Sequence, residues 1–95
     1  MHSAVLRVEL HLPHARSLKD KRSVLRPILD GARHRFGVAA SEVSQQDLWQ
    51  SAELGFSAVS STVGHVGEVL DNVERFVWSF PEVEVSSCER LWLEV

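Results

Sequence analysis

Five cationic side chains lie close together in the stretch RSLKDKRSVLR, residues 16–26, of an acidic chain. Residues 16–35 hold seven of the ten Lys and Arg residues but two of the thirteen Asp and Glu residues, while the formal net charge is -3. Such an uneven distribution of charge bears on the binding partners of a protein more than on its fold. A row of cations can neutralise several phosphates, which makes binding dependent on salt. The chemistry that this stretch favours is therefore the binding of an anion.

A helix that begins after Ser17 would carry all of these cations except Arg16. Ser17 can cap its N-terminus and Gly37 suits its C-terminal end, while Pro27 predicts either a kink or a later start. Apolar residues recur on one stripe of this helix at helical spacing. They are Leu18, Leu25, Leu29, Ala32 and Phe36, flanked by Val24 and Ile28. One face of the predicted helix is therefore buried against the rest of the protein.

Four of the cations fall on one flank of this helix, beside the buried stripe. At 100° per residue they lie within an arc of about 60°, over about 21 Å of helix. They are Lys19, Arg22, Arg26 and Arg33. Together with Arg16 they are the predicted nucleic-acid-binding residues, whereas Lys21 and Arg35 are expected on the opposite flank. The alternative is a solvated helix face whose long side chains cover the edge of the core.

Four strands and a second helix are expected around this first helix. Alternation of apolar and polar residues predicts strands over 3–12, 51–60 and 83–95, a weaker strand over 38–44, and an amphipathic helix over 61–80. The β-α-β-β-α-β order in 95 residues predicts a single domain, 1–95. Its fold class is α+β and ferredoxin-like, with a four-stranded antiparallel sheet, two helices on one face, and the other face partly open.

The open face of this sheet is a second candidate for binding. In the last strand Leu91 and Leu93 alternate with Arg90 and Trp92, and we expect Arg90 and Trp92 on the open face as a homodimer interface. The alternative is that the protein itself partly covers this face. The outward positions of the first and third strands carry no aromatic residue, so stacking of RNA bases on the central strands is not expected.

The remaining polar residues do not suggest catalysis or metal binding. His11 and His14 are too few for a metal site, and Cys88 has no second cysteine to form an internal disulfide. Arg7 and Glu9 interrupt the first apolar run, which excludes a signal peptide or a membrane span there. The sequence therefore predicts a non-enzymatic cytoplasmic protein without catalytic residues, cofactor, metal or membrane partner.

Three stretches of the chain resemble the YlxP-like family of small bacterial proteins. They are RSLKDKRSVLRPIL, QQDLWQSAELGFSAVSS and VLDNVERFVWSFPEVEV, and the resemblance covers nearly the whole chain. It implies a ferredoxin-like fold and no established activity. Genes of this family often lie near those for translation initiation factor two, ribosome-binding factor A and the NusA transcription factor. The resemblance therefore implies a role around RNA or the ribosome.

Two motifs carry most of this resemblance. The first marks Ser17, Leu18, Lys19, Lys21 and Arg22, with Asp20 where a Glu is common; the second marks Gln46, Asp47, Trp49, Gln50 and Glu53. The resemblance assigns no catalytic role to any of them. We interpret Trp49 as an anchor of its loop on the edge of the core in preference to a binding contact.

Three functions remain open at this point. The first is an RNA- or ribosome-associated accessory factor that binds RNA or a ribosomal subunit through the basic helix flank. The second is a homo-oligomerising interaction module that uses the open sheet face. The third is a small-ligand sensor, for which the sequence offers no pocket.

Overall fold

The computed structural model describes residues 1–93 and contains four strands and two helices. In chain order they are β1 (His2–His11), α1 (Leu18–Phe36), β2 (Ala39–Ser44), β3 (Ser51–Ser60), α2 (Val63–Trp78) and β4 (Glu84–Leu93). The predicted order is confirmed, with each element within a few residues of its predicted bounds. The last two residues of the predicted final strand, 94–95, lie outside the described residues.

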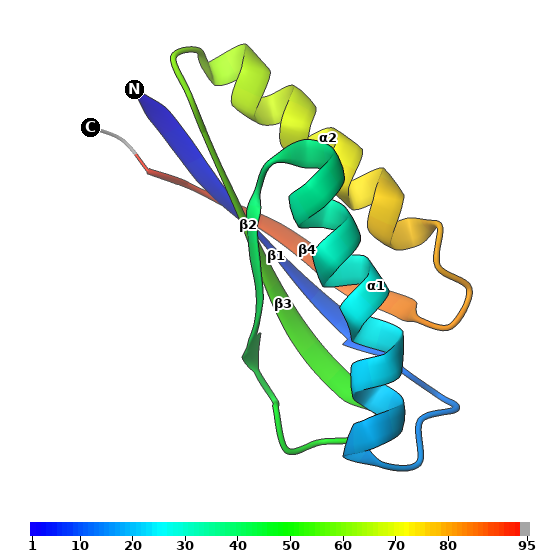
Figure 1. The fold of residues 1–95 in the computed structure, drawn as a ribbon. Helices are drawn as coiled ribbons and strands as arrows, with labels where there is room; N and C mark the ends of the chain where they lie inside the picture. Colours follow the sequence, from blue (N-terminus) through cyan, green and yellow to red (C-terminus); the bar gives the residue numbers. More distant parts are fainter. Residues whose placement is uncertain (94–95) are drawn as a thin grey trace.

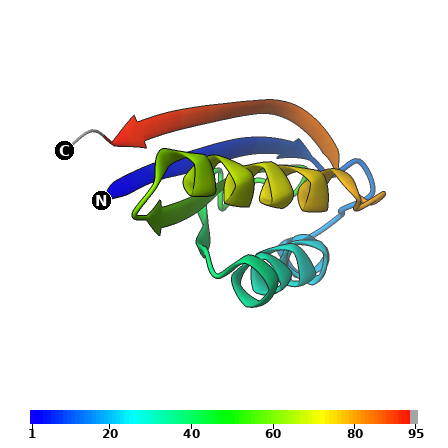
Figure 2. The same cartoon turned by 90° about the horizontal axis from the view of Figure 1, so that it is seen from above.

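All four strands form one antiparallel sheet in the order β2-β3-β1-β4. Both helices lie on the same face of this sheet, as Figure 1 and the view from above in Figure 2 show. Helix α1 packs near β2, whereas α2 covers β3 and β1. This arrangement confirms the predicted α+β, ferredoxin-like class. It also makes β2 and β4 the two edge strands.

The first helix begins and ends at the predicted residues. The Ser17 hydroxyl accepts a hydrogen bond from the Asp20 backbone N–H at 3.0 Å, which satisfies one free donor of the first turn. At the other end Gly37 adopts a left-handed φ of 65° and donates its N–H to the Arg33 carbonyl. Because the helix starts at Leu18 and continues past Pro27, the alternative of a later start is wrong.

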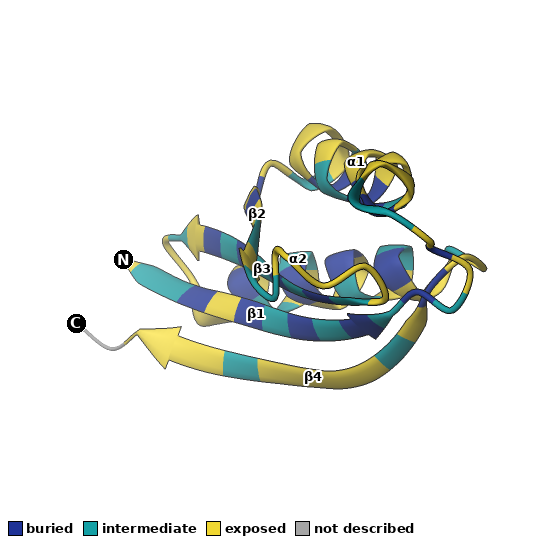
Figure 3. Cartoon of the chain, turned by 90° about the horizontal axis from the view of Figure 1, so that it is seen from below, coloured by how far each residue is buried: buried dark blue, intermediate teal, exposed yellow. Residues whose placement is uncertain are grey.

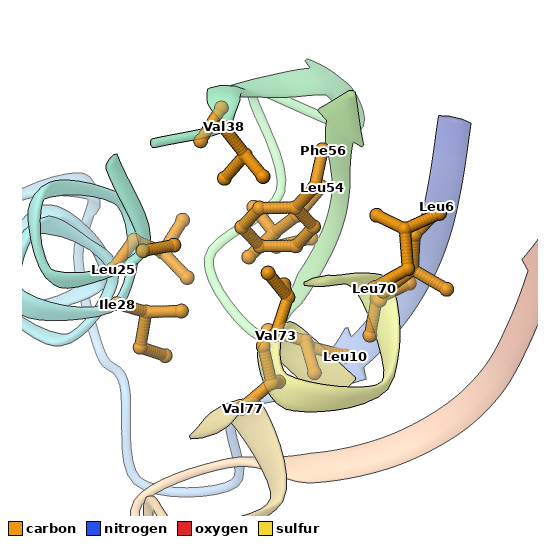
Figure 4. Packing of buried hydrophobic residues seen from close by; sticks show 14 of the residues in the cluster. Leu6, Leu10, Leu25, Ile28, Val38, Leu54, Phe56, Leu70, Val73 and Val77 are labelled. Carbon is orange, nitrogen blue, oxygen red and sulfur yellow. The ribbon is translucent and has the colours of Figure 1, made fainter. Parts of the chain in front are cut away.

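The core lies between the sheet and the two helices, where alternate strand residues meet the apolar stripe of each helix (Figure 4). The residues labelled there come from β1, β3, both helices and the position just before β2. They are Leu6, Leu10, Leu25, Ile28, Val38, Leu54, Phe56, Leu70, Val73 and Val77. The described elements therefore share one core and hold the surface of α1 in a fixed position relative to the sheet.

A β-bulge in β4 changes which residues face the helices. Leu10 pairs with Val85 but Glu9 pairs with Ser87, so Ser86 is an extra residue in β4. An extra residue reverses the alternation of side chains beyond it. Beyond the bulge Trp92 pairs with buried Ala4, so it shares the helix-covered face.

Our placement of Arg90 and Trp92 on the open face is therefore wrong. Arg90 pairs with buried Leu6 and also lies on the helix-covered face. The residues that occupy the open face are Leu91, opposite Val5, and Leu93, opposite Ser3. The bulge thus places two leucines on the face where the sequence pattern predicted Arg90 and Trp92.

Candidate nucleic-acid interface

The predicted basic flank is present on the outer surface of α1. The side chains of Lys19, Arg22, Arg26 and Arg33 are all exposed, and Arg16 is exposed just before the helix. Within residues 1–93 no ion pair engages Arg16, Lys19, Arg22 or Arg26. Their charges are therefore available to an external anion.

Arg33 differs from the other members of this flank. One terminal nitrogen lies 2.8 Å from the Asp30 carboxylate, and the other donates to the Ala40 carbonyl at 2.6 Å. Both ends of the guanidinium fork are thus occupied by the protein. Arg33 joins α1 to β2 and neutralises Asp30, so it contributes less free positive charge than Arg22 or Arg26.

The sequence predicts Lys21 on the flank opposite the cationic row, and the structure shows that Lys21 is buried, with 1% of its surface exposed. Its ammonium group donates to the carbonyls of Gln45 at 2.7 Å and Leu48 at 2.6 Å. It also lies 2.6 Å from Glu42 Oε2, in an ion pair without hydrogen-bond alignment. Two hydrogen-bonded carbonyls and the charge of one carboxylate compensate for the burial of this cation.

A helical wheel contains the signal for this burial. At 100° per residue Lys21 falls between Ile28 and Ala32, both of which are buried. The wheel does not identify the groups that accept from Lys21, because these groups lie on β2 and on the loop that follows it. A lysine within a buried arc is therefore a sign of a buried partner.

Gln50 connects the second motif to the loop that precedes α1. Its side-chain nitrogen donates to the carbonyls of Ala15 at 3.1 Å and Pro13 at 3.3 Å. The backbone carbonyl of Gln50 accepts a hydrogen bond from the Leu12 N–H at 2.9 Å and lies 2.9 Å from His11 Nδ1. The two motifs, distant in sequence, thus meet around the N-terminal end of α1, where Lys21 and Gln50 have structural roles.

The remaining residues of the second motif lie on the surface. Gln46, Asp47 and Trp49 are exposed, and Trp49 has 54% of its surface accessible, so its expected packing on the core edge is wrong. Glu53 is half-buried and faces the open side of the sheet, directly opposite Glu9 on β1. Trp49 is therefore a surface aromatic, one residue away from the carbonyl of Leu48 that Lys21 binds.

A shallow depression of about 200 Å³ separates α1 from β2. Its lining combines arginines with an apolar floor and two acids: Arg22, Leu25, Arg26, Leu29, Asp30, Arg33 and Glu42. The two acids are already paired, Asp30 with Arg33 and Glu42 with Lys21. The positive charge that remains in the depression comes from Arg22 and Arg26.

At the edge of the sheet opposite β2, Arg90 links β4 to α2. Its guanidinium lies 2.6 Å from Asp71 and 3.9 Å from Glu74. Partial burial raises the pKa of the neighbouring Cys88 thiol to about 11, helped by a hydrogen bond to Glu74 and the charge of that carboxylate, while Arg90 acts in the opposite direction. This thiol therefore stays protonated at neutral pH, which makes it a poor nucleophile.

Residues 1–93 contain no cluster of three or more His, Cys, Asp or Glu side chains that could hold a metal ion. Neither of the two helices in this part of the chain is long and apolar enough to span a membrane.

These features define a small α+β protein with a ferredoxin-like fold and a cationic flank on its first helix, in which Arg22 and Arg26 make no ion pair within residues 1–93. The family model described as "Protein of unknown function (DUF503)" matches residues 4–90, and the chain belongs to this family. A relative named "Uncharacterized protein YlxP", from Bacillus subtilis (strain 168), is 41% identical over 78 residues, which are 82% of this chain and 85% of the relative. The predicted membership of the YlxP-like family is thereby confirmed.

Proposed function

We propose that this protein is a non-enzymatic accessory factor that binds RNA, free or within a ribosomal subunit, through the basic flank of α1. The observation that carries the proposal is that Arg22 and Arg26 are exposed, unpaired within residues 1–93, and line one depression. Lys19 and Arg16 extend this charge toward the N-terminal end of the helix. The proposal places the protein in the cytoplasm.

The position of the acids supports an anionic partner. On a solvated helix face, cations and anions that lie three or four residues apart can pair and neutralise one another. In the depression, by contrast, both acids are neutralised by Lys21 and Arg33, and neither reaches Arg22 or Arg26. The protein thus satisfies its own acids with other cations.

The shape of the site supports contacts with the phosphate backbone rather than enclosure of a small ligand. A depression of about 200 Å³ lies below the roughly 300–1,000 Å³ of small-molecule pockets. The outward residues of the two central strands include Val5, Arg7, Gly55 and Ser57, with no aromatic platform for bases. Recognition would therefore depend on charge and shape, and the family's gene neighbourhood favours RNA as the anion.

The test is co-sedimentation of the purified protein with ribosomal subunits across a salt series. The Arg22→Glu/Arg26→Glu variant should lose binding at low salt, because each phosphate contact contributes to the salt-dependent affinity. The matched control is Arg7→Glu/Arg75→Glu, which makes the same change in net charge on the open face and on α2. The control variant should bind as the unchanged protein does. Equal loss in both variants, or no binding by the unchanged protein, contradicts the proposal.

A second candidate function, self-association, is favoured by a separate observation. The open face of the sheet exposes apolar side chains on all four strands: Val5, Val43, Val59, Leu91 and Leu93. Exposed apolar clusters mark contact surfaces more often than scattered single residues do. In this candidate function the protein works as a dimer.

A further inference from the structure

The outer edge of β4 is the longest exposed edge of the sheet. β4 has ten residues and ends the sheet order, whereas the opposite edge strand, β2, has six residues and lies beside α1. Figure 3 shows β4 as the outermost strand and exposed along most of its length. One side of its backbone pairs with β1, which leaves the hydrogen-bonding groups of the other side without a strand partner in the described structure.

The last three described residues of this strand are all large, apolar and exposed. The exposed fractions are 48% for Leu91, 43% for Trp92 and 60% for Leu93. Because of the bulge, the two leucines project from the open face and Trp92 from the helix-covered face. The end of β4 is therefore apolar on both of its faces.

The usual devices that protect an edge strand are placed elsewhere in β4. The bulge lies at Ser86, near the beginning of the strand. Arg90 is the nearest cation, but its guanidinium is bound to Asp71 and Glu74 on α2. No charge, proline or bulge interrupts residues 91–93. An exposed apolar edge of this kind is a template for another strand.

We propose that this edge pairs with β4 of a second copy of the chain, in antiparallel orientation, to give a two-fold symmetric dimer with one continuous sheet. This inference deepens the self-association named above as the second candidate function and rests on it. It is independent of RNA binding, because α1 and β2 lie at the other end of the strand order.

The sequence of the strand fits its own copy. In a continuous sheet each residue must pair with one on the same face, so the symmetry axis lies midway between one β4 residue and the same residue of the second copy. Centring on Trp92 pairs Trp92 with Trp92 of the second copy, and each Leu91 with Leu93 of the second copy. Centring on Arg90 would instead oppose two like charges. The apolar register is thus self-complementary on both faces, and this complementarity identifies a second copy as the partner.

Sedimentation equilibrium over a range of protein concentrations tests the dimer and its mode of assembly. Trp92→Lys should raise the dissociation constant of the dimer by about tenfold or more, because it places two ammonium groups at the axis. Val59→Lys is the matched control, since Val59 is 65% exposed on the open face but lies on β3, away from the edge. This control should leave the dissociation constant within about twofold of the unchanged value.

A larger effect at Trp92 than at Val59 supports edge pairing. An equal or reversed order of effects means that the copies associate face to face, which overturns the edge model but leaves self-association standing. A chain that stays monomeric at millimolar concentration overturns both. Thermal unfolding of each variant, followed by circular dichroism, verifies that the variant is folded. If Trp92→Lys does not fold, Trp92→Gln is the milder variant that replaces it.

Discussion

The two edges of the sheet differ in the chemistry that they present. The β2 edge is short and lies beside α1, which carries exposed arginines. The buried Lys21 of α1 also binds the loop that follows β2. The β4 edge is long, and its end is apolar on both faces. Charge on one edge and exposed backbone with apolar side chains on the other suit different partners, a polyanion and a second strand.

Salt separates these two kinds of contact. Binding of a polyanion releases counterions and weakens steeply as salt rises. Pairing of apolar strand ends depends on hydrophobic burial and backbone hydrogen bonds. Neither involves a net charge that salt could screen, so the dissociation constant of the dimer should change little with salt. The two proposed surfaces should therefore respond differently to the same titration, and variants at one should leave the other unchanged.

The largest expected effect of a substitution comes from the β2 side. Lys21→Met should lower the free energy of unfolding by about 3–5 kcal/mol, because it leaves Glu42 without its ion-pair partner and removes the donor to two loop carbonyls. Urea unfolding at neutral pH measures this loss. Lys19→Met, on the exposed flank, is the control and should change stability by no more than about 0.5 kcal/mol.

A second variant distinguishes the ion pair from the loop contacts. Lys21→Met/Glu42→Leu removes the unpaired carboxylate and should recover part of the lost stability. The carbonyls of Gln45 and Leu48 would still lack their donor, so recovery should be incomplete. Similar stability for Lys21→Met and Lys19→Met would contradict the structural role of Lys21.

A smaller effect is expected on the β4 side. Arg90→Gln should destabilise the protein by about 1 kcal/mol, since Arg90 joins β4 to α2 but its partners are partly solvated. The loss should shrink in high salt, which screens the pair. Arg75→Gln provides the same change of charge on α2 and should be nearly neutral, because the one side-chain partner of Arg75 within residues 1–93 is Asn72. Equal losses in the two variants would show that Arg90 adds nothing to the attachment of β4.

The smallest effect concerns the reactivity of Cys88. A pKa of about 11, against an ordinary 9.0, reduces the thiolate fraction at pH 8, and the greater nucleophilicity of the remaining thiolate offsets only part of this loss. Alkylation by iodoacetamide at pH 8 should be about tenfold slower in the folded chain than in the same chain unfolded by urea. Glu74→Gln should increase the folded rate, though burial of the thiol remains. Equal folded and unfolded rates would contradict the raised pKa.

The same shift has a consequence for stability at alkaline pH. Because the folded state favours the protonated thiol, this contribution to stability is fully present below about pH 9. It is lost as pH rises through the folded value of about 11.

Local sequence patterns were sufficient to predict the order of elements and the capping of α1. Periods of two and of about 3.6 residues identify strands and helices locally, and Ser17 and Gly37 supply cap chemistry within one turn. The exposed flank of Arg22 and Arg26 follows from the same local geometry. These features needed no knowledge of distant contacts.

The face of Trp92 and the partners of Lys21 depend on contacts between segments that are distant in the sequence. A bulge depends on the register between β1 and β4, and one extra residue at Ser86 reverses every later side chain without altering the local pattern. The acceptors of Lys21 come from residues more than twenty positions away. Periodicity describes how a segment divides into faces, but only contacts between distant segments decide what each face meets.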